Sequence, residues 1–308
     1  MIDAWRIDSA AEKNSGRKKK VLLTGASGFL GWNVCTVARE DVELFGVVFS
    51  HPLKIEGVKI VRADLTDALE MKRIFNEIRP EAVIHTAASS HPNFCELNRA
   101  HAYKINVEAS FNIADLCAEH SIPCVFTSSD LVFDGLHPPY REDDPVCPVN
   151  AYGEQKAMAE AGMVQRYPAV TICRMPLMFG VPGPAATSFI QPMIEAMRAE
   201  RELKLFTDEF RTPSSGQDAV RGLFIALERT GEILHLGGPE RISRFDFGRL
   251  LQEVLGLDRA VLKPCRRRDV QMAAARPPDV SLDGTKAFRI GFHSAPPGKA
   301  LLELAALL

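Results

Sequence analysis

Short apolar runs alternate with longer amphipathic stretches along the first two thirds of the chain. The apolar runs predict strands at 21–23, 44–49, 58–61, 82–86, 123–128, 169–174 and 233–236. Between them, apolar residues recur at helical spacing, which predicts helices from about Phe29 onward and over 71–78, 98–119, 152–165 and 218–228. Strands alternating with helices form βαβ units, and wholly apolar strands are covered on both sheet faces. We therefore expect a doubly wound α/β fold with a parallel sheet.

Three glycines stand between the first predicted strand and the first helix. Gly25, Gly28 and Gly31 would let the backbone turn sharply and approach a pyrophosphate, whose charge is favoured at a helix N-terminus. A Walker-type phosphate loop is excluded, because Gly31 is followed by Trp32 and Asn33 instead of Lys and Ser or Thr. The position of the loop predicts a dinucleotide site in a Rossmann sheet.

The regular alternation weakens after residue 174, where prolines and glycines interrupt the chain at 176, 182–184, 277–278 and 296–297. We expect a flexible extension over 1–17 and an NAD(P)-binding domain over 18–180, to which 216–237 returns. Residues 181–215 and 238–308 are then expected to form a smaller, mixed lobe that binds substrate.

Composition narrows the class of protein. A chain of 308 residues with 46% hydrophobic and 25% charged residues is typical of a soluble globular protein, and a net charge of -2 argues against a nucleic-acid partner. The seven cysteines include no Cys-x-x-Cys pair, which favours reduced cytoplasmic thiols and predicts no metal site. No apolar run is long enough to cross a bilayer, and no signal-like core begins the chain. We expect a cytoplasmic protein without a membrane partner.

The ends of the next strands suggest how a cofactor would be held. Ser50, His51 and Lys54 follow the second strand, where NAD-binding proteins carry an acidic residue, so we favour NADP over NAD; His51 could equally be an ordinary surface residue. Asp64 could accept a hydrogen bond from adenine or cap the following helix. The small residues at 87–89 allow the backbone to approach a cofactor closely.

Candidate catalytic residues lie in two segments. Tyr152 and Lys156 are four apart, so they share one face of the predicted helix, and a nearby ammonium would lower the pKa of the phenol. Tyr152 could then exchange a proton with a carbonyl oxygen as hydride is transferred. Ser129, at a strand end, could hydrogen-bond that carbonyl, although serine there is also an ordinary turn former. Asn106 could hold a water molecule or support Lys156.

Several stretches together resemble extended short-chain dehydrogenases/reductases, and among these the dTDP-4-dehydrorhamnose reductase branch. They are the glycine loop, Asp64-Leu65, the His-Thr-Ala-Ala run at 85–88, Ser128-Ser129 and Tyr152-x-x-x-Lys156, with the branch-like segments 128–135, 140–145, 148–156, 235–238, 242–245 and 276–283. The resemblance covers roughly residues 20–295.

The resemblance implies site residues and a reaction. Ser129, Tyr152 and Lys156 would be catalytic, with Asn106 in support; the cofactor would contact Gly25, Ser27, Gly28, Phe29, Leu30, Gly31, Ser50, His51, Asp64, Leu65, Ala87, Ala88, Ser89, Thr127, Lys156, Arg174, Pro176 and Leu177. The substrate would contact Ser129, Asp130, Met178, Phe179 and Arg211; Arg211 could pair with a diphosphate or be a surface residue. The implied reaction is reduction by NADPH of the 4-keto group of a nucleotide-linked 6-deoxysugar.

Two departures and two alternatives accompany this expectation. Leu131 stands where the branch usually has Tyr, which leaves that substrate contact in doubt, and the absence of Glu after Asp130 argues against a dehydratase. An NAD-dependent nucleotide-sugar epimerase uses the same catalytic residues without a net reductant. The regulatory subunit of methionine adenosyltransferase also resembles this branch, and it binds NADP as a partner protein without catalysis. A homodimer is possible in any of these cases.

Overall fold

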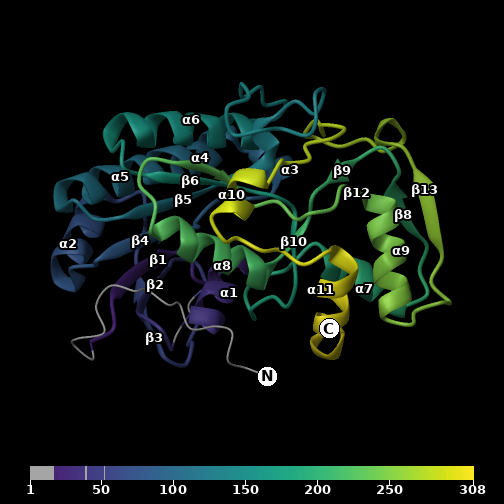
Figure 1. The fold of residues 1–308 in the computed structure, drawn as a ribbon, viewed down its shortest axis with the longest axis horizontal. Coiled ribbons are helices and arrows are strands. Elements are labelled where there is room, and N and C mark those ends of the chain that lie inside the picture. The colour runs from purple at the N-terminus through teal and green to yellow at the C-terminus, as the bar shows by residue number, and fades with distance from the viewer. Residues whose placement is uncertain (1–16, 39, 52) are drawn as a thin grey trace.

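The computed structural model describes residues 17–38, 40–51 and 53–308, so the predicted N-terminal extension lies outside the described residues except for Arg17. Its centre is a seven-stranded sheet with the strand order β11-β6-β5-β4-β1-β2-β3 (Figure 1). All neighbouring strands are parallel, and their bounds are β1 Lys20–Thr24, β2 Glu43–Val48, β3 Val58–Arg62, β4 Ala82–His85, β5 Cys124–Ser129, β6 Thr171–Met175 and β11 Ile233–His235. The predicted doubly wound Rossmann fold is confirmed.

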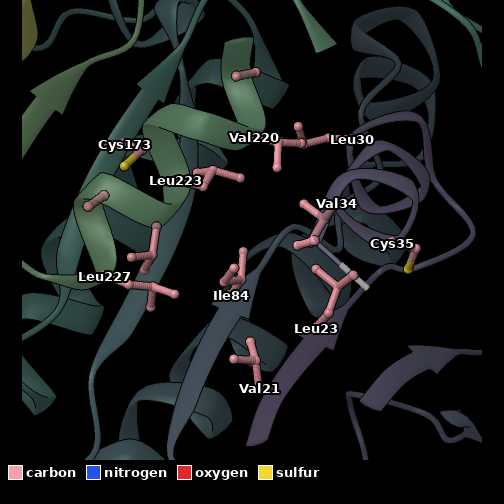
Figure 2. Packing of buried hydrophobic residues seen from close by; sticks show 14 of the residues in the cluster. Val21, Leu23, Leu30, Val34, Cys35, Ile84, Cys173, Val220, Leu223 and Leu227 are labelled. Carbon is pink, nitrogen blue, oxygen red and sulfur yellow. The ribbon is translucent and has the colours of Figure 1, made fainter. Parts of the chain in front are cut away.

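Helices cover both faces of this sheet. Successive side chains of a strand point to opposite faces, so the apolar strands present apolar residues on both sides. Val21, Leu23 and Ile84 face one side, where they pack against helices α1 (Phe29–Ala38) and α8 (Gly216–Leu227), as Figure 2 shows. Leu22 and Val83 face the other side, which is covered by α2 (Ala68–Ile78), α5 (Ala109–His120) and α6 (Ala151–Arg166). The apolar strands are therefore buried on both faces, as their composition predicts.

The helical pattern expected over 98–119 contains an irregular turn. Helix α3 (Pro92–Leu97) is followed by α4 (Arg99–Tyr103), by a π-helical turn at Lys104–Glu108, and then by α5. Such turns insert an extra residue into a helix and occur frequently at functional sites. Asn106 lies in this turn and is completely buried.

A smaller lobe contains three two-stranded sheets and a core of its own. The pairs are β7 (Met178–Phe179) with β10 (Ser214–Ser215), β9 (Phe210–Arg211) with β12 (Ile242–Ser243), and β8 (Leu203–Phe206) with β13 (Leu262–Cys265). Helices α7 (Ile190–Arg198), α9 (Arg244–Val254) and α11 (Pro297–Leu304) pack around Phe179, Phe247 and Leu301. In Figure 1 this lobe lies at one end of the molecule.

Part of the C-terminal segment packs against the main sheet instead of this lobe. Ala287, in α10 (Thr285–Arg289), and Phe292 belong to the core beneath α8, while Val280 and Leu282 pack with Phe133. The division of the chain at 238 stays a prediction, and residues beyond it contribute to the packing around the main sheet as well as to the lobe. No helix among the described residues is long and apolar enough to cross a membrane.

Candidate functional site

The three loop glycines are required for different reasons. Gly25 has φ +72°, and a Cβ there would lie 2.7 Å from Cα of Ala87. A Cβ on Gly31 would overlap the carbonyl oxygen of Gly25, so both positions are explained by packing within the protein. Gly28 is exposed, and its Cβ would only approach that same oxygen at 3.3 Å. Gly28 is thus the glycine whose surface is free to face a ligand.

The other residues of the loop divide between surface and core. Ser27 and Phe29 are half-buried, and Phe29 lies against Gly180. Leu30 is 7% exposed and its side chain belongs to the core beneath α1, so only its backbone is available for the expected cofactor contact.

A buried histidine ties the glycine loop to the next strand end. The Oγ1 of Thr24 lies 2.6 Å from Nδ1 of His85, whose Nε2 lies 3.0 Å from the hydroxyl of Ser110. The backbone N–H of Ala87 donates to the same Thr24 hydroxyl at 3.2 Å. Burial, with the positive charge of Lys156, lowers the pKa of His85 to about 3. A neutral His85 therefore positions Ala87, Ala88 and Ser89 beside the loop, and Thr24 is a positioning residue that sequence reasoning missed.

The end of the second strand is exposed and contains no carboxylate. Ser50, His51 and Lys54 are all exposed, as is Arg62 at the end of β3, which pairs in register with Val48. Arg62 directly follows the predicted third strand, so its position in the sequence could have identified it as a further candidate for contact with the cofactor.

Asp64 does not cap helix α2. Its Oδ1 accepts hydrogen bonds from the backbone N–H and the hydroxyl of Thr66, while Asp67 is the N-cap and accepts from the N–H groups of Leu69 and Glu70. The capping alternative for Asp64 is therefore wrong. Leu65 is half-buried, and its carbonyl oxygen accepts from Asn112.

The candidate catalytic side chains converge at the ends of β5 and α6. Ser129, Tyr152 and Lys156 are 7%, 8% and 1% exposed. A Cβ on Gly153 would overlap the carbonyl oxygen of Leu131, so glycine is needed for α6 to approach the turn after β5. Asn150 begins α6 by accepting from the N–H of Gly153 at 3.0 Å. The tertiary structure thus brings the two predicted segments together.

The electrostatics of this group differ from the expectation. Burial raises the pKa of Tyr152, the charges of Asp130 and Cys95 raise it further, and a hydrogen bond with Ser129 only partly opposes them. Burial lowers the pKa of Lys156 to about 7, and its Nζ donates to the carbonyl oxygen of Thr127 at 2.8 Å. The predicted lowering of the Tyr152 pKa by Lys156 is wrong here, because the loss of hydration dominates for both groups.

Asn106 organises the backbone around these residues. Its Oδ1 accepts from the N–H of Ser89 at 2.8 Å, and its Nδ2 donates to the Ser89 carbonyl oxygen at 3.1 Å and to Oε1 of Gln155 at 2.8 Å. Asn106 therefore joins the strand-end segment to α6 through Gln155, the neighbour of Lys156 in sequence.

The remaining expected cofactor residues lie in β5, in β6 and directly after β6. Thr127 is buried and its hydroxyl donates to the His85 carbonyl oxygen at 3.1 Å. Arg174 is 3% exposed and bonded to Glu160, with Nε to Oε1 at 3.1 Å and Nη2 to Oε2 at 2.9 Å. Its guanidinium is engaged inside the protein, so the backbone of Arg174 is the part left for the expected cofactor contact. Pro176 is buried, and Leu177 is half-buried and accepts from the N–H of Ser214.

The expected substrate contacts are also divided. Met178 is half-buried, but Phe179 is completely buried against Phe247, with ring centroids 5.3 Å apart, so its side chain is not available to a substrate. Arg211 is 5% exposed, which makes the surface alternative wrong. Its Nε lies 3.4 Å from Oδ2 of Asp130, and its Nη2 lies 3.5 Å from Oε1 of Glu209.

Two further arginines contact the carboxylate of Glu209. Nη1 of Arg276 lies 3.2 Å from Oε2 of Glu209, and Nε of Arg244 lies 4.0 Å from its Oε1. We define the arginine cluster as Arg211, Arg244 and Arg276. Sequence reasoning missed Glu209, Arg244 and Arg276, since no local pattern connects segments this far apart. No group of three or more His, Cys, Asp and Glu side chains that could hold a metal ion occurs among the described residues.

Known proteins with similar sequences carry different names. The chain is 26% identical over 287 residues to methionine adenosyltransferase 2 subunit beta from Xenopus laevis, covering 91% of this chain and 84% of that protein. It is 28% identical over 265 residues to the probable low-salt glycan biosynthesis reductase Agl14 from Haloferax volcanii, covering 85% of this chain and 88% of that protein.

Solved structures share the whole fold. A hypothetical dTDP-4-dehydrorhamnose reductase from Sulfolobus tokodaii is 29% identical, with a TM-score of 0.81 over 90% of this chain and 98% of that one. Two more distant structures share the fold with bound cofactors. They are a dTDP-4-dehydrorhamnose reductase from Bacillus anthracis with NADP (23% identical, TM-score 0.81, covering 94% and 100%) and WbmG from Bordetella bronchiseptica with NAD (20%, 0.79, 96% and 95%).

The family assignment rests on nearly the whole chain. The model of the RmlD substrate binding domain matches residues 19–305. The chain therefore belongs to the RmlD substrate binding domain family, within the extended short-chain dehydrogenases/reductases.

Proposed function

We propose that the protein is an NADPH-dependent reductase that acts on the 4-keto group of a nucleotide-linked deoxysugar. The observation that carries this proposal is that α6 brings Tyr152 beside Ser129 and Lys156 to the Thr127 carbonyl oxygen at the carboxyl end of β5. The exposed Gly28 follows β1 at the same edge of the sheet. Ligands of doubly wound sheets bind at this edge.

The raised pKa of Tyr152 supports the reductive direction. A phenol that stays protonated at neutral pH can donate its proton to a carbonyl oxygen as hydride arrives from the cofactor. Ser129 would hydrogen-bond the same oxygen and stabilise its developing charge. Lys156 would hold the backbone at Thr127 and a cofactor hydroxyl, while Asn106 would keep Ser89 and α6 in place.

The glycine loop and the strand ends would hold the cofactor. Gly28 and Ser27 would face the pyrophosphate, and Ala87, Ala88 and Ser89 would line the nicotinamide side. Ser50, His51 and Arg62 place polar and basic groups where a carboxylate would select NAD, which favours NADP, with NAD as the alternative.

A second candidate function is a cofactor-binding partner protein. The similarity to methionine adenosyltransferase 2 subunit beta over 91% of the chain favours it, and a binding module can retain all of the catalytic side chains. The epimerase alternative needs a group that removes a proton as well as one that returns it. The raised pKa of Tyr152 makes the phenolate harder to form and weighs against that reaction.

The first experiment is a fluorescence titration with NADPH, followed by the loss of its absorbance on adding dTDP-4-keto-6-deoxy-L-mannose. Binding with oxidation would establish the reductase. Binding without oxidation would favour an epimerase or a partner protein, and a stoichiometric partner in a pulldown would distinguish the latter.

Tyr152→Phe tests the chemistry separately from binding. We expect turnover to fall by about 10²–10⁴-fold, because the proton donor is lost, while NADPH affinity stays nearly unchanged. Unchanged turnover would remove Tyr152 from the reaction.

Gly28→Val tests the position of the cofactor. A β-branched side chain on this exposed glycine should block the pyrophosphate, so we expect NADPH binding to be lost while the far-UV circular dichroism stays native. Thr36→Val, at an exposed position of helix α1, which begins directly after Gly28, is the matched control and should bind normally. Equal NADPH affinity in both variants would overturn the loop assignment.

A further inference from the structure

Arg211 lies between two carboxylates that belong to different parts of the molecule. Asp130 follows β5 of the main sheet, while Glu209 precedes β9 of the smaller lobe. Arg211 contacts Asp130 at 3.4 Å and Glu209 at 3.5 Å, and its hydrogen bond within its own strand goes to the carbonyl oxygen of Phe210 at 2.7 Å. These are long ion-pair distances for groups that are almost completely buried.

The arginine cluster carries more positive charge than its surroundings neutralise. Among the described residues, the carboxylates within 4 Å of these three guanidinium groups are those of Glu209 and Asp130, which leaves one positive charge in excess. Among the described residues, Oδ2 of Asp130 and Nη1 of Arg244 are buried without a hydrogen-bond partner. Buried polar atoms without a partner are costly, so both atoms would gain from a change of partner.

We propose that Asp130 and Arg211 form an ion pair that a phosphoryl anion breaks. The anion takes Arg211 and the free Nη1 of Arg244 as its partners, and Asp130, left buried without a counter-ion, takes up a proton from solvent beside Tyr152. The inference rests on the proposed function in identifying the anion as the diphosphate of a nucleotide-linked ligand.

The charges around Asp130 explain why it is the group that takes up the proton. Burial raises the pKa of Asp130 to about 6, and the charge of Glu209 adds to this, whereas Arg211 and the hydrogen bond from Ser129 oppose it. The negative charge of Asp130 also acts on Tyr152 of α6, whose phenol it helps to keep neutral by raising its pKa. When Arg211 turns to an anion, the largest opposing contribution is lost, so the pKa rises further and the carboxyl is protonated near pH 7.

Protonation of Asp130 changes the pKa of Tyr152, the proposed proton donor. The negative charge of Asp130 is, after burial, the strongest influence that raises the pKa of Tyr152. Neutral Asp130 removes that influence, so Tyr152 releases its proton more readily once the anion has bound. Binding of the charged end of the ligand thereby prepares proton donation at the other end.

The test is isothermal titration calorimetry with sulfate, a dianion that does not itself titrate near pH 7. Measurements in buffers of different ionisation enthalpy give the number of protons exchanged. We expect uptake of up to about one proton per sulfate in the wild type. Asp130→Asn should bind sulfate more tightly with no uptake, because the competing carboxylate is gone. Asp258→Asn, an exposed residue of the same lobe, should behave as the wild type.

The outcomes are decisive without any turnover assay. Absence of sulfate binding, absence of uptake in the wild type, or equal uptake in Asp130→Asn would overturn the proposal, whether or not the protein reduces a keto-sugar. A second titration uses dTDP-glucose, whose diphosphate also does not titrate near pH 7. The same uptake, with displacement of sulfate, would identify a nucleotide-linked diphosphate as the anion. Uptake with sulfate and none with bound dTDP-glucose would refute that source and leave free phosphate.

Discussion

Two buried arginines, Arg174 and Arg211, show how differently one residue type can be used in this molecule. Arg174 makes a two-pronged bond to Glu160, donates to the carbonyl oxygen of Glu142 at 3.3 Å and lies 3.3 Å from Nε2 of His235. Arg211 has carboxylates on two sides at 3.4 and 3.5 Å. Burial is the same in both cases, but only Arg174 is fully engaged.

The difference follows from where the partners come from. Glu160 lies on α6, which directly precedes β6, so the Arg174 pair closes within one helix–strand unit of the main sheet. Arg211 joins the main sheet to the smaller lobe and shares Glu209 with Arg244 and Arg276. The fully bonded Arg174–Glu160 pair stabilises the fold. Arg211, which shares its carboxylates and belongs to a group with excess positive charge, can instead exchange a carboxylate for an anionic ligand.

Arg174→Met should have the largest effect on stability. It leaves Glu160 buried without its counter-ion, and breaking such a pair costs about 3–5 kcal/mol. Urea unfolding followed by circular dichroism measures this, and sulfate affinity of the folded fraction should not change. A loss of unfolding free energy below about 1 kcal/mol would mean that Arg174 and Glu160 do not form a buried ion pair in solution.

Arg211→Met should act mainly on ligand binding. We expect sulfate affinity to fall about tenfold or more, which corresponds to about 1.4 kcal/mol, because the anion loses its principal partner. Stability should fall by less than about 2 kcal/mol, since Arg244 and Arg276 still face Glu209 and Asp130 can be protonated. Arg259→Met, an exposed charge of the same lobe, controls for net charge. The two arginines would be equivalent if Arg211→Met unfolded the protein as Arg174→Met does.

The two sites should also respond to pH with opposite sign. Burial, together with Arg174, lowers the pKa of His235 from 6.5 to about 3, so the unfolded chain binds the proton first and the free energy of unfolding falls as pH drops below about 6.5. Burial raises the pKa of Asp130 from 3.8 to about 6, so its contribution to the free energy of unfolding rises as pH drops from about 6 to 4.

Urea unfolding between about pH 7.5 and 4.5 separates these contributions, each limited to about 1.4 kcal/mol per pH unit. The free energy of unfolding of Asp130→Asn, relative to the wild type, should be highest at the high end of this pH range. That of His235→Asn, relative to the wild type, should be highest at the low end. Parallel pH dependence in both variants would contradict the assignment of the two sites.

Much of the main sheet could be predicted from the sequence, because it depends on periodicity and on neighbouring residues. The strand beginning at Lys20 and the helix beginning at Phe29 follow from an apolar run, three glycines and an apolar helical pattern that are continuous in the chain. The four-residue spacing of Tyr152 and Lys156 likewise determined that they share a face of α6.

Only the tertiary structure decided how the charged residues are used. A strand end carrying Arg174 and one carrying Arg211 look alike in the sequence, since each arginine's role is set by partners brought to it in space. The sequence also supplied the Tyr152–Lys156 pair without its pKa values, because those depend on hydration, and hydration is removed only when strands, helices and lobe close around the site. Local secondary structure depends on neighbouring residues in the sequence, whereas burial and long-range charge pairing exist only once the chain is folded.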